Sequence, residues 1–130
     1  MAQNAASLDK TGSEAHRRPG RPVDLVHLAR QCLGDAGLEQ EILRLFDTTV
    51  KTYFSRLQLS TTFDEVAMNL HSLKGAAGGV GAWAIADLAK AAETELKAGR
   101  PLGPERIADI GMAVEEVSGF IAEMLSNDRV

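Results

Sequence analysis

The sequence predicts an all-α fold, an antiparallel up-down four-helix bundle with an additional short N-terminal helix. Alanine and leucine are the commonest residues and β-branched runs are scarce, so helix propensity exceeds strand propensity along most of the chain. Apolar residues make up 45% of the 130 residues, which suffices for one domain with a single packed core. Four long segments space apolar residues by three and four and are joined by short loops, which favours antiparallel neighbours.

Residues 1–20 mix polar, small and charged side chains without an apolar period, so we expect a disordered leader there and a helical bundle over 21–130. The run RRPGRP near the end of this segment is similar to minor-groove-binding hooks, but a proline interrupts their usual Arg-Gly-Arg-Pro order. The net charge of −4 also disfavours binding to nucleic acid or to an anionic membrane surface. We therefore expect a solvated linker and no partner of either kind.

The chain shows no apolar segment of the kind that enters or crosses a membrane. No signal-peptide core follows the charged N-terminal residues, and no run approaches about 18 consecutive apolar residues. Cys32 is the only cysteine, which excludes an internal disulfide and suits a reducing compartment. These observations predict a cytoplasmic protein.

Two helices are expected in the first half of the domain. The first runs from Pro22, a residue type favoured at the start of a helix, to about Leu33, where the sequence GDAG ends it. Its inward face follows the i, i+3, i+4, i+7 spacing: Leu25, Leu28, Ala29 and Cys32. The second runs from about Leu38 to Leu57. Its expected apolar stripe comprises Leu38, Ile42, Leu45, Phe46, Tyr53, Phe54 and Leu57.

The third helix has a clear start, because Thr62 followed three residues later by Glu65 is the pattern of a capping box. Its apolar positions alternate spacings of three and four: Phe63, Val66, Leu70, Leu73, Ala77 and Val80. Because this period continues past Gly75, we expect the helix to end only at Gly81.

Two further helices complete the bundle. The fourth is expected from Trp83, a packing residue, to about Ala98, with Gly99 in the usual position after a helix end. Its inward positions are Ile85, Leu88, Ala89, Ala92 and Leu96. The fifth is expected from about Pro104 to Ser126. Its inward positions are Ile107, Ile110, Val114, Val117, Ile121 and Met124.

His71 is the candidate functional residue of the third helix. At about 100° per residue it falls roughly 130° from the centre of the apolar arc, so it should face water. Gly75 and Gly78 lie within about 40° of it, and Lys74 lies at the border between core and solvent. Glycine in a helix costs about 1 kcal/mol relative to alanine, so Gly75, Gly78 and Gly79 together cost about 3 kcal/mol. These glycines suggest a surface cleared for a partner that approaches the imidazole.

A histidine beside a lysine on an open helix face suits phosphoryl chemistry. A neutral imidazole, with a reference pKa of about 6.5, is a competent nucleophile at cytoplasmic pH. The ammonium group of Lys74, one turn from His71, can hold oxygens of a phosphoryl group that arrives on the ring.

The stretch HSLKGAAGGVGA resembles the signature of the histidine-phosphotransfer (HPt) domain family, in which His-x-x-Lys-Gly is followed by small residues. The likeness covers about residues 22–126, and its motif positions are His71, Lys74, Gly75 and Gly81. It implies a phosphorelay intermediate with its histidine on the second long helix of a four-helix bundle. In that role His71 accepts a phosphoryl group from an aspartyl phosphate on a receiver domain and passes it to another receiver.

The same resemblance implies roles for the neighbouring residues. Lys74 would stabilise the phosphate, Gly75 would give it room, and Met68 with Gly78 and Gly79 would border the docking patch. The expected partners are response-regulator receiver domains and a hybrid histidine kinase, and we expect the chain to act as a monomer. No Walker-type run or kinase glycine loop is present, so we expect neither ATP binding nor a cofactor of its own, and Mg²⁺ would come with the receiver's acidic pocket.

The main alternative is a non-catalytic helical bundle that binds proteins without phosphotransfer. The run GVGAWA fits the dinucleotide fingerprint Gly-x-Gly-x-x-Ala, but that fingerprint needs a preceding strand, and none is expected. His16, His27 and Cys32 lack the paired spacing of a metal site, so no metal is expected. Glu93 lies four residues before Lys97, and we interpret the two as a helix-supporting pair without a functional role.

Overall fold

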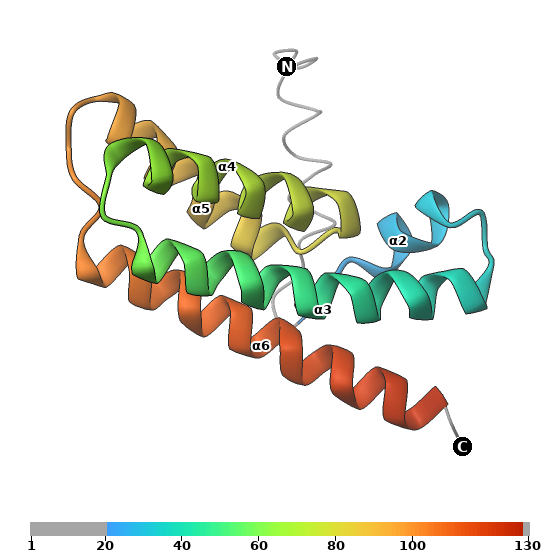
Figure 1. The fold of residues 1–130 in the computed structure, drawn as a ribbon. Coiled ribbons are helices and arrows are strands. Elements are labelled where there is room, and N and C mark those ends of the chain that lie inside the picture. Colours follow the sequence, from blue (N-terminus) through green and yellow to red (C-terminus); the bar gives the residue numbers. More distant parts are fainter. Residues whose placement is uncertain (1–20, 129–130) are drawn as a thin grey trace, which may run out of the picture.

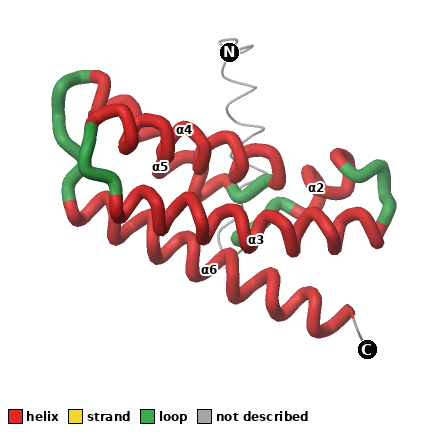
Figure 2. Tube along the Cα trace, in the orientation of Figure 1, coloured by secondary structure: helices red, strands yellow, loops and turns green. Residues whose placement is uncertain are grey.

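The computed structural model describes residues 21–128. The expected leader, which includes His16, Arg17 and Arg18, lies outside the described residues. Within 21–128 every regular element is a helix, which confirms the all-α prediction (Figure 2). The helices are α2 (Leu25–Gln31), α3 (Ala36–Leu59), α4 (Phe63–Val80), α5 (Trp83–Lys97) and α6 (Pro104–Asp128).

The four long helices form a bundle in which α3 and α5 each pack against both α4 and α6. Figure 1 shows consecutive long helices running in opposite directions, with the short helix α2 against one end of the bundle, where it contacts α3 and α4. None of the described helices is both long and apolar enough to span a bilayer. Every helix contributes fully buried side chains to the core, among them Leu28, Leu43, Leu57, Leu70, Leu73, Ile85, Ile110 and Ile121.

The start and the end of α4 are both fixed by local interactions. The Thr62 hydroxyl accepts a hydrogen bond from the backbone N–H of Glu65 at 3.1 Å, and the Glu65 carboxylate accepts one from the N–H of Thr62 at 3.4 Å, so the expected capping box is present. The helix ends, as expected, at Gly81, which is left-handed with a φ of 87°. A β-carbon at Gly81 would lie 2.9 Å from Cβ of Asp24, so both conformation and space require glycine there.

Part of the apolar stripe expected on the second helix is wrong. Leu38 and Leu45 are 44% and 64% exposed, whereas Leu43 and Val50, which the stripe omitted, are buried. The reason is that α3 has two apolar faces. Positions 43, 46, 50 and 57 pack in the core, and positions 38, 42 and 45 line a groove beside α2. Spacings of three and four fit both faces, so the sequence pattern did not separate them.

Two expectations at helix starts are also wrong. Phe63, expected on the inward stripe, is 59% exposed because it is the first residue of α4 and lies at the end of the bundle. The short helix begins at Leu25 rather than Pro22, because the Asp24 carboxylate caps it by accepting a hydrogen bond from the N–H of His27 at 3.0 Å. The other expected boundaries fall within two residues of the observed ones.

Candidate functional site

His71 stands on the solvent-facing side of α4, as the helical period predicts. Its side chain is 74% exposed, while its neighbours Leu70 and Leu73 are fully buried. Successive residues of a helix are turned by about 100°, so burial of the two leucines fixes the backbone beneath the ring and directs the ring outward. The imidazole is therefore accessible to a macromolecular partner.

A buried carboxylate from the neighbouring helix contacts the imidazole. Glu93 on α5 is 8% exposed, and its Oε2 atom lies 3.3 Å from Nδ1 of His71. Its Oε1 atom lies 2.8 Å from Nζ of Lys74. Only residues 81 and 82 separate α4 from α5, so the two helices lie side by side and bring residues 22 positions apart into contact. One carboxylate thus bridges the histidine and the lysine of the motif.

The interpretation of Glu93 and Lys97 as a simple helix-supporting pair is wrong, because Glu93 points inward and binds residues of α4. Glu93 lies on the buried face of α5, four residues after Ala89 and three before Leu96, both of which are buried. An acidic residue at such a position needs a partner, since burial of an unpaired charge is costly. This spacing was the signal that could have identified Glu93 from the sequence.

Lys74 lies at the boundary between core and solvent, as expected, with a side chain that is 35% exposed. Its ammonium group has three N–H donors, one of which is directed to Glu93. Because Glu93 also contacts His71, the ammonium group is held on the imidazole's side of the helix.

Electrostatic interactions keep Glu93 ionised. Burial by itself would raise the pKa of Glu93, but the hydrogen bond and positive charge of Lys74, followed by the interactions with His71, lower that pKa below its ordinary value. A carboxylate only accepts hydrogen bonds, so the Nδ1 atom of a neutral His71 carries the proton in this contact. The Nε2 atom then holds the lone pair, and a nucleophilic nitrogen is available at the exposed ring.

Three residues that follow His71 on α4 are glycines and carry no side chain. Gly75 and Gly79 are exposed, Gly78 is half-buried, and a β-carbon at any of the three would meet nothing within 4 Å. Packing within the described chain therefore gives no reason for these glycines or for their propensity cost of about 1 kcal/mol each. Met68, one turn before His71, is 62% exposed and extends this open face. The role of these four residues in partner binding stays a prediction.

The remaining candidates lie outside the cluster of His71, Lys74 and Glu93. Cys32 is buried, and burial raises the pKa of its thiol. His27 is half-buried, with its Nε2 atom 3.2 Å from the carbonyl oxygen of Gly79. Among residues 21–128, no three His, Cys, Asp or Glu side chains are grouped as metal ligands. The run GVGAWA spans the end of α4 and the start of α5, so a helix precedes it where a dinucleotide fingerprint needs a strand.

Comparison with protein-family models identifies the Hpt domain over residues 41–126. This match covers more than half of the 130 residues and includes His71, Lys74 and Glu93. Neither the search of curated proteins nor the search of solved structures gave a match. The extent of the family match, on an all-helical chain with an exposed histidine in its motif, shows that the chain belongs to the Hpt domain family.

Proposed function

We propose that this chain is a histidine phosphotransfer protein of a two-component phosphorelay. His71 accepts a phosphoryl group from an aspartyl phosphate on one receiver domain and passes it to another. The observation that carries this proposal is the exposed imidazole whose Nδ1 atom contacts the buried Glu93 carboxylate and whose Nε2 atom is left open. Membership of the Hpt family supports it.

The transfer step follows from the protonation of the site. The Nε2 lone pair of His71 attacks the phosphorus atom of the aspartyl phosphate, and an N–P bond forms. The P–O bond to the aspartate breaks, and the carboxylate of the partner leaves with the electron pair. The proton on Nδ1 stays in place, and Glu93 opposes the positive charge that develops on the ring. The reverse reaction on a second receiver completes the relay.

Lys74 and the glycines serve the incoming group. The Lys74 ammonium, held 2.8 Å from Glu93, offers its other N–H donors to the phosphoryl oxygens. Gly75, Gly78 and Gly79 leave room for the partner's surface, and Met68 offers an exposed apolar contact. Mg²⁺ belongs to the acidic pocket of the receiver, which also supplies the aspartate. The chain acts as a cytoplasmic monomer with receiver domains and a hybrid histidine kinase as partners.

The experiment is transfer from purified receiver domains that carry radioactive phosphate on their aspartate. We expect label on the wild-type chain and none on the His71→Gln variant, with mass spectrometry at neutral pH placing the phosphate on residue 71. His16→Gln is the matched control, because it removes a histidine outside the stretch that matches the family and should keep the label. If no receiver of the source organism labels the wild-type chain, the protein is instead a non-catalytic interaction module.

A further inference from the structure

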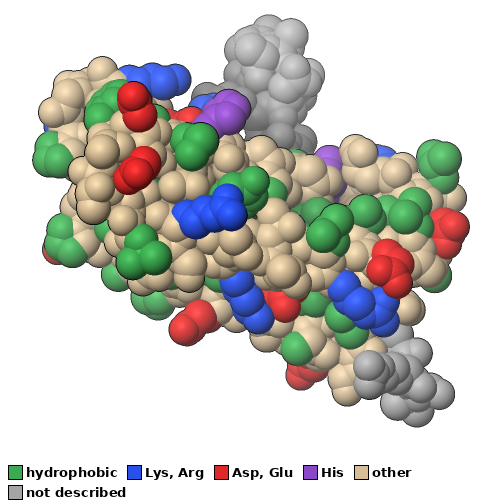
Figure 3. Space-filling model, in the orientation of Figure 1, with side chains coloured by type: hydrophobic (Ala, Val, Ile, Leu, Met, Phe, Trp, Pro, Cys, Tyr) green, Lys and Arg blue, Asp and Glu red, His purple; other side chains and the backbone are tan. Residues whose placement is uncertain are grey.

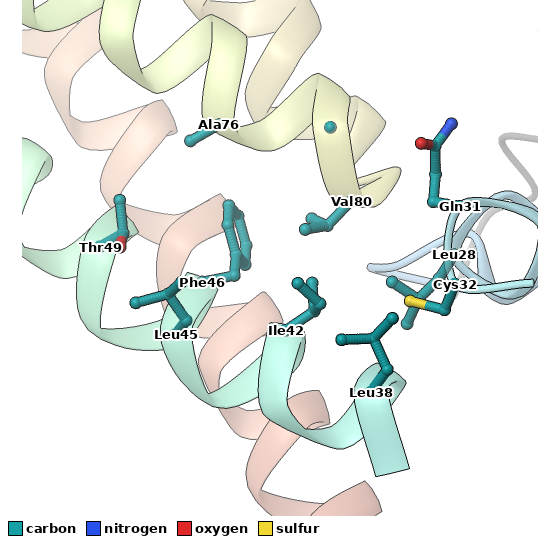
Figure 4. Close-up of a pocket in the computed structure, with 11 residues that line it drawn as sticks. Leu28, Gln31, Cys32, Leu38, Ile42, Leu45, Phe46, Thr49, Ala76 and Val80 are labelled. Atoms are coloured by element: carbon teal, nitrogen blue, oxygen red, sulfur yellow. The ribbon is translucent and has the colours of Figure 1, made fainter. Parts of the chain in front are cut away.

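An apolar groove, here called the α2–α4 groove, lies between helices α2, α3 and α4 and has a volume of about 400 Å³. Figure 4 shows Leu28 of α2, Cys32 at the end of α2, Ile42 of α3 and Val80 of α4 pointing toward one another across it. Leu45 stands on its rim at 64% exposure. Figure 3 shows further hydrophobic side chains gathered on the surface over α2 and the adjoining part of α3. Contiguous apolar surface that stays exposed on a folded protein is a feature of interaction sites.

The α2–α4 groove lies further along the helix that carries the proposed phosphorylation site. Ala76 and Gly79 line the groove and follow His71 on the same helix. With a rise of about 1.5 Å per residue, Gly79 lies about 12 Å further along the helix axis than His71. A standard interface buries about 800 Å² on each partner, which corresponds to a disc of about 16 Å radius. A receiver domain centred on His71 therefore reaches the groove. We argue that the surface of this receiver occupies the groove when the two proteins dock.

One wall of the groove is α2, which has only 7 residues and depends on tertiary contacts. Asp24, 7% exposed, makes three of these contacts. Its Oδ2 atom accepts a hydrogen bond from Nε1 of Trp83 at 2.9 Å, and its Oδ1 atom accepts one from the N–H of His27 at 3.0 Å. Its own N–H donates to the carbonyl oxygen of Gly81 at 2.9 Å. Asp24 therefore joins the start of α2 to the connection between α4 and α5.

The imidazole of His27 strengthens this junction. It contacts the carbonyl oxygen of Gly79 through Nε2, and its ring packs edge-on against the indole of Trp83 with centroids 5.0 Å apart. The groove wall is thus connected, through Asp24 and His27, to the helix end that follows the phosphorylation site.

We propose that Asp24 is a positioning residue for receiver docking. Through Trp83 and the Gly81 turn, it holds α2 in place so that the α2–α4 groove is complete when the receiver arrives. This inference rests on the proposed function. The apparent affinity for a partner that needs α2 in place falls in proportion to the fraction of molecules that have it there.

The experiment uses the full chain with the receiver that labels the wild type, and with phosphoramidate, a small donor that needs no docking. For Asp24→Ala we expect the KM for the phosphorylated receiver to rise about fivefold or more, as when α2 is seated in one molecule of five. The rate at saturating receiver and the rate with phosphoramidate should stay at wild-type values. Amide hydrogen exchange should become faster over residues 24–32. Asp24→Asn keeps one hydrogen-bond acceptor, so its KM should lie between those of Asp24→Ala and the wild type.

Three further variants complete the experiment. Trp83→Phe removes the indole donor and should reproduce the rise in KM, which keeps the test valid if Asp24→Ala unfolds. Thr62→Ala removes the cap at the other end of α4 and should leave the KM unchanged. Leu45→Lys places a charge on the groove rim and should raise the KM without faster exchange in α2.

The inference is refuted if Asp24→Ala accelerates exchange in α2 while the KM stays at the wild-type value. A wild-type KM in Leu45→Lys would refute the groove as the docking surface. Failure of the proposed function looks different: no receiver then labels the wild-type chain, and the docking role of Asp24 falls with it.

Discussion

Replacement of Gly75 by a larger residue should make the protein more stable and the relay slower. Gly75 lies inside α4, is exposed, and a β-carbon there would meet nothing within 4 Å. Alanine is better than glycine in a helix by about 1 kcal/mol, which corresponds to about 4 °C in Tm for a domain of roughly 100 residues. A larger side chain should keep this gain and clash with the docked partner, at a cost of about 1.4 kcal/mol or more for Gly75→Leu, which is tenfold in transfer rate.

Gly119 provides the matched control. It is also exposed inside a helix, α6, and a β-carbon there would meet nothing within 4 Å. Helix α6 packs against α3 and α5 and not against α4, so Gly119 is remote from His71. Gly119→Ala should therefore raise the Tm by a similar amount and leave transfer unchanged.

The two properties are measured separately, by thermal unfolding followed with circular dichroism and by single-turnover transfer from a phosphorylated receiver. A Gly75→Leu variant that gains stability and transfers at the wild-type rate would refute the explanation of the glycines as space for a partner. A loss of stability in Gly75→Ala would mean instead that the glycine serves the fold.

The other predictions concern Glu93 and Gly81. Glu93→Gln should slow transfer about fivefold in a single-turnover assay. The single amide oxygen cannot accept hydrogen bonds from both His71 and Lys74, and a hydrogen bond to a charged group contributes at least about 1 kcal/mol. An unchanged transfer rate would exclude a role for the carboxylate. The pKa of Glu93 is lowered in the folded protein, so its ionised form stabilises the fold above the unfolded pKa of about 4.3, and this contribution is lost as pH falls through the folded value. The stability difference between wild type and Glu93→Gln should accordingly shrink between pH 7 and pH 3 in urea titrations, and a difference that is constant with pH would contradict this assignment. Gly81→Ala should destabilise the protein by about 2 kcal/mol or more, because a φ of 87° disfavours a side chain and Asp24 occupies the space that a β-carbon would need. A variant that unfolds at the same urea concentration as the wild type would disprove this.

The helices and the face that carries His71 could be predicted from the sequence because their causes are local. Propensity, the capping box at Thr62 and the left-handed glycine at Gly81 act within a few residues. The period of three and four then places the apolar positions of α4 on one side and His71 on the other. Such local signals do not depend on which other helices pack against this one, so they can be recognised in the sequence alone.

The interactions that could not be predicted are tertiary. The spacing of Glu93 to Ala89 and Leu96 could mark it as inward-facing, but its partner His71 lies 22 positions away, which no pattern within one helix identifies. Asp24 binds Trp83 across 59 positions, which no pattern within one helix reveals. Leu45 belongs to an apolar face that a helical wheel cannot distinguish from the core, because both faces have the same spacing.

The position of the indole has a practical consequence. Trp83 is the only tryptophan in the chain, and it lies where α2 meets the connection between α4 and α5. Tryptophan fluorescence therefore reports on a single residue, which borders the surface where we expect a partner to bind. The unmodified protein carries its own optical probe, and stopped-flow mixing with a tryptophan-free receiver can follow each encounter without a dye or a tag.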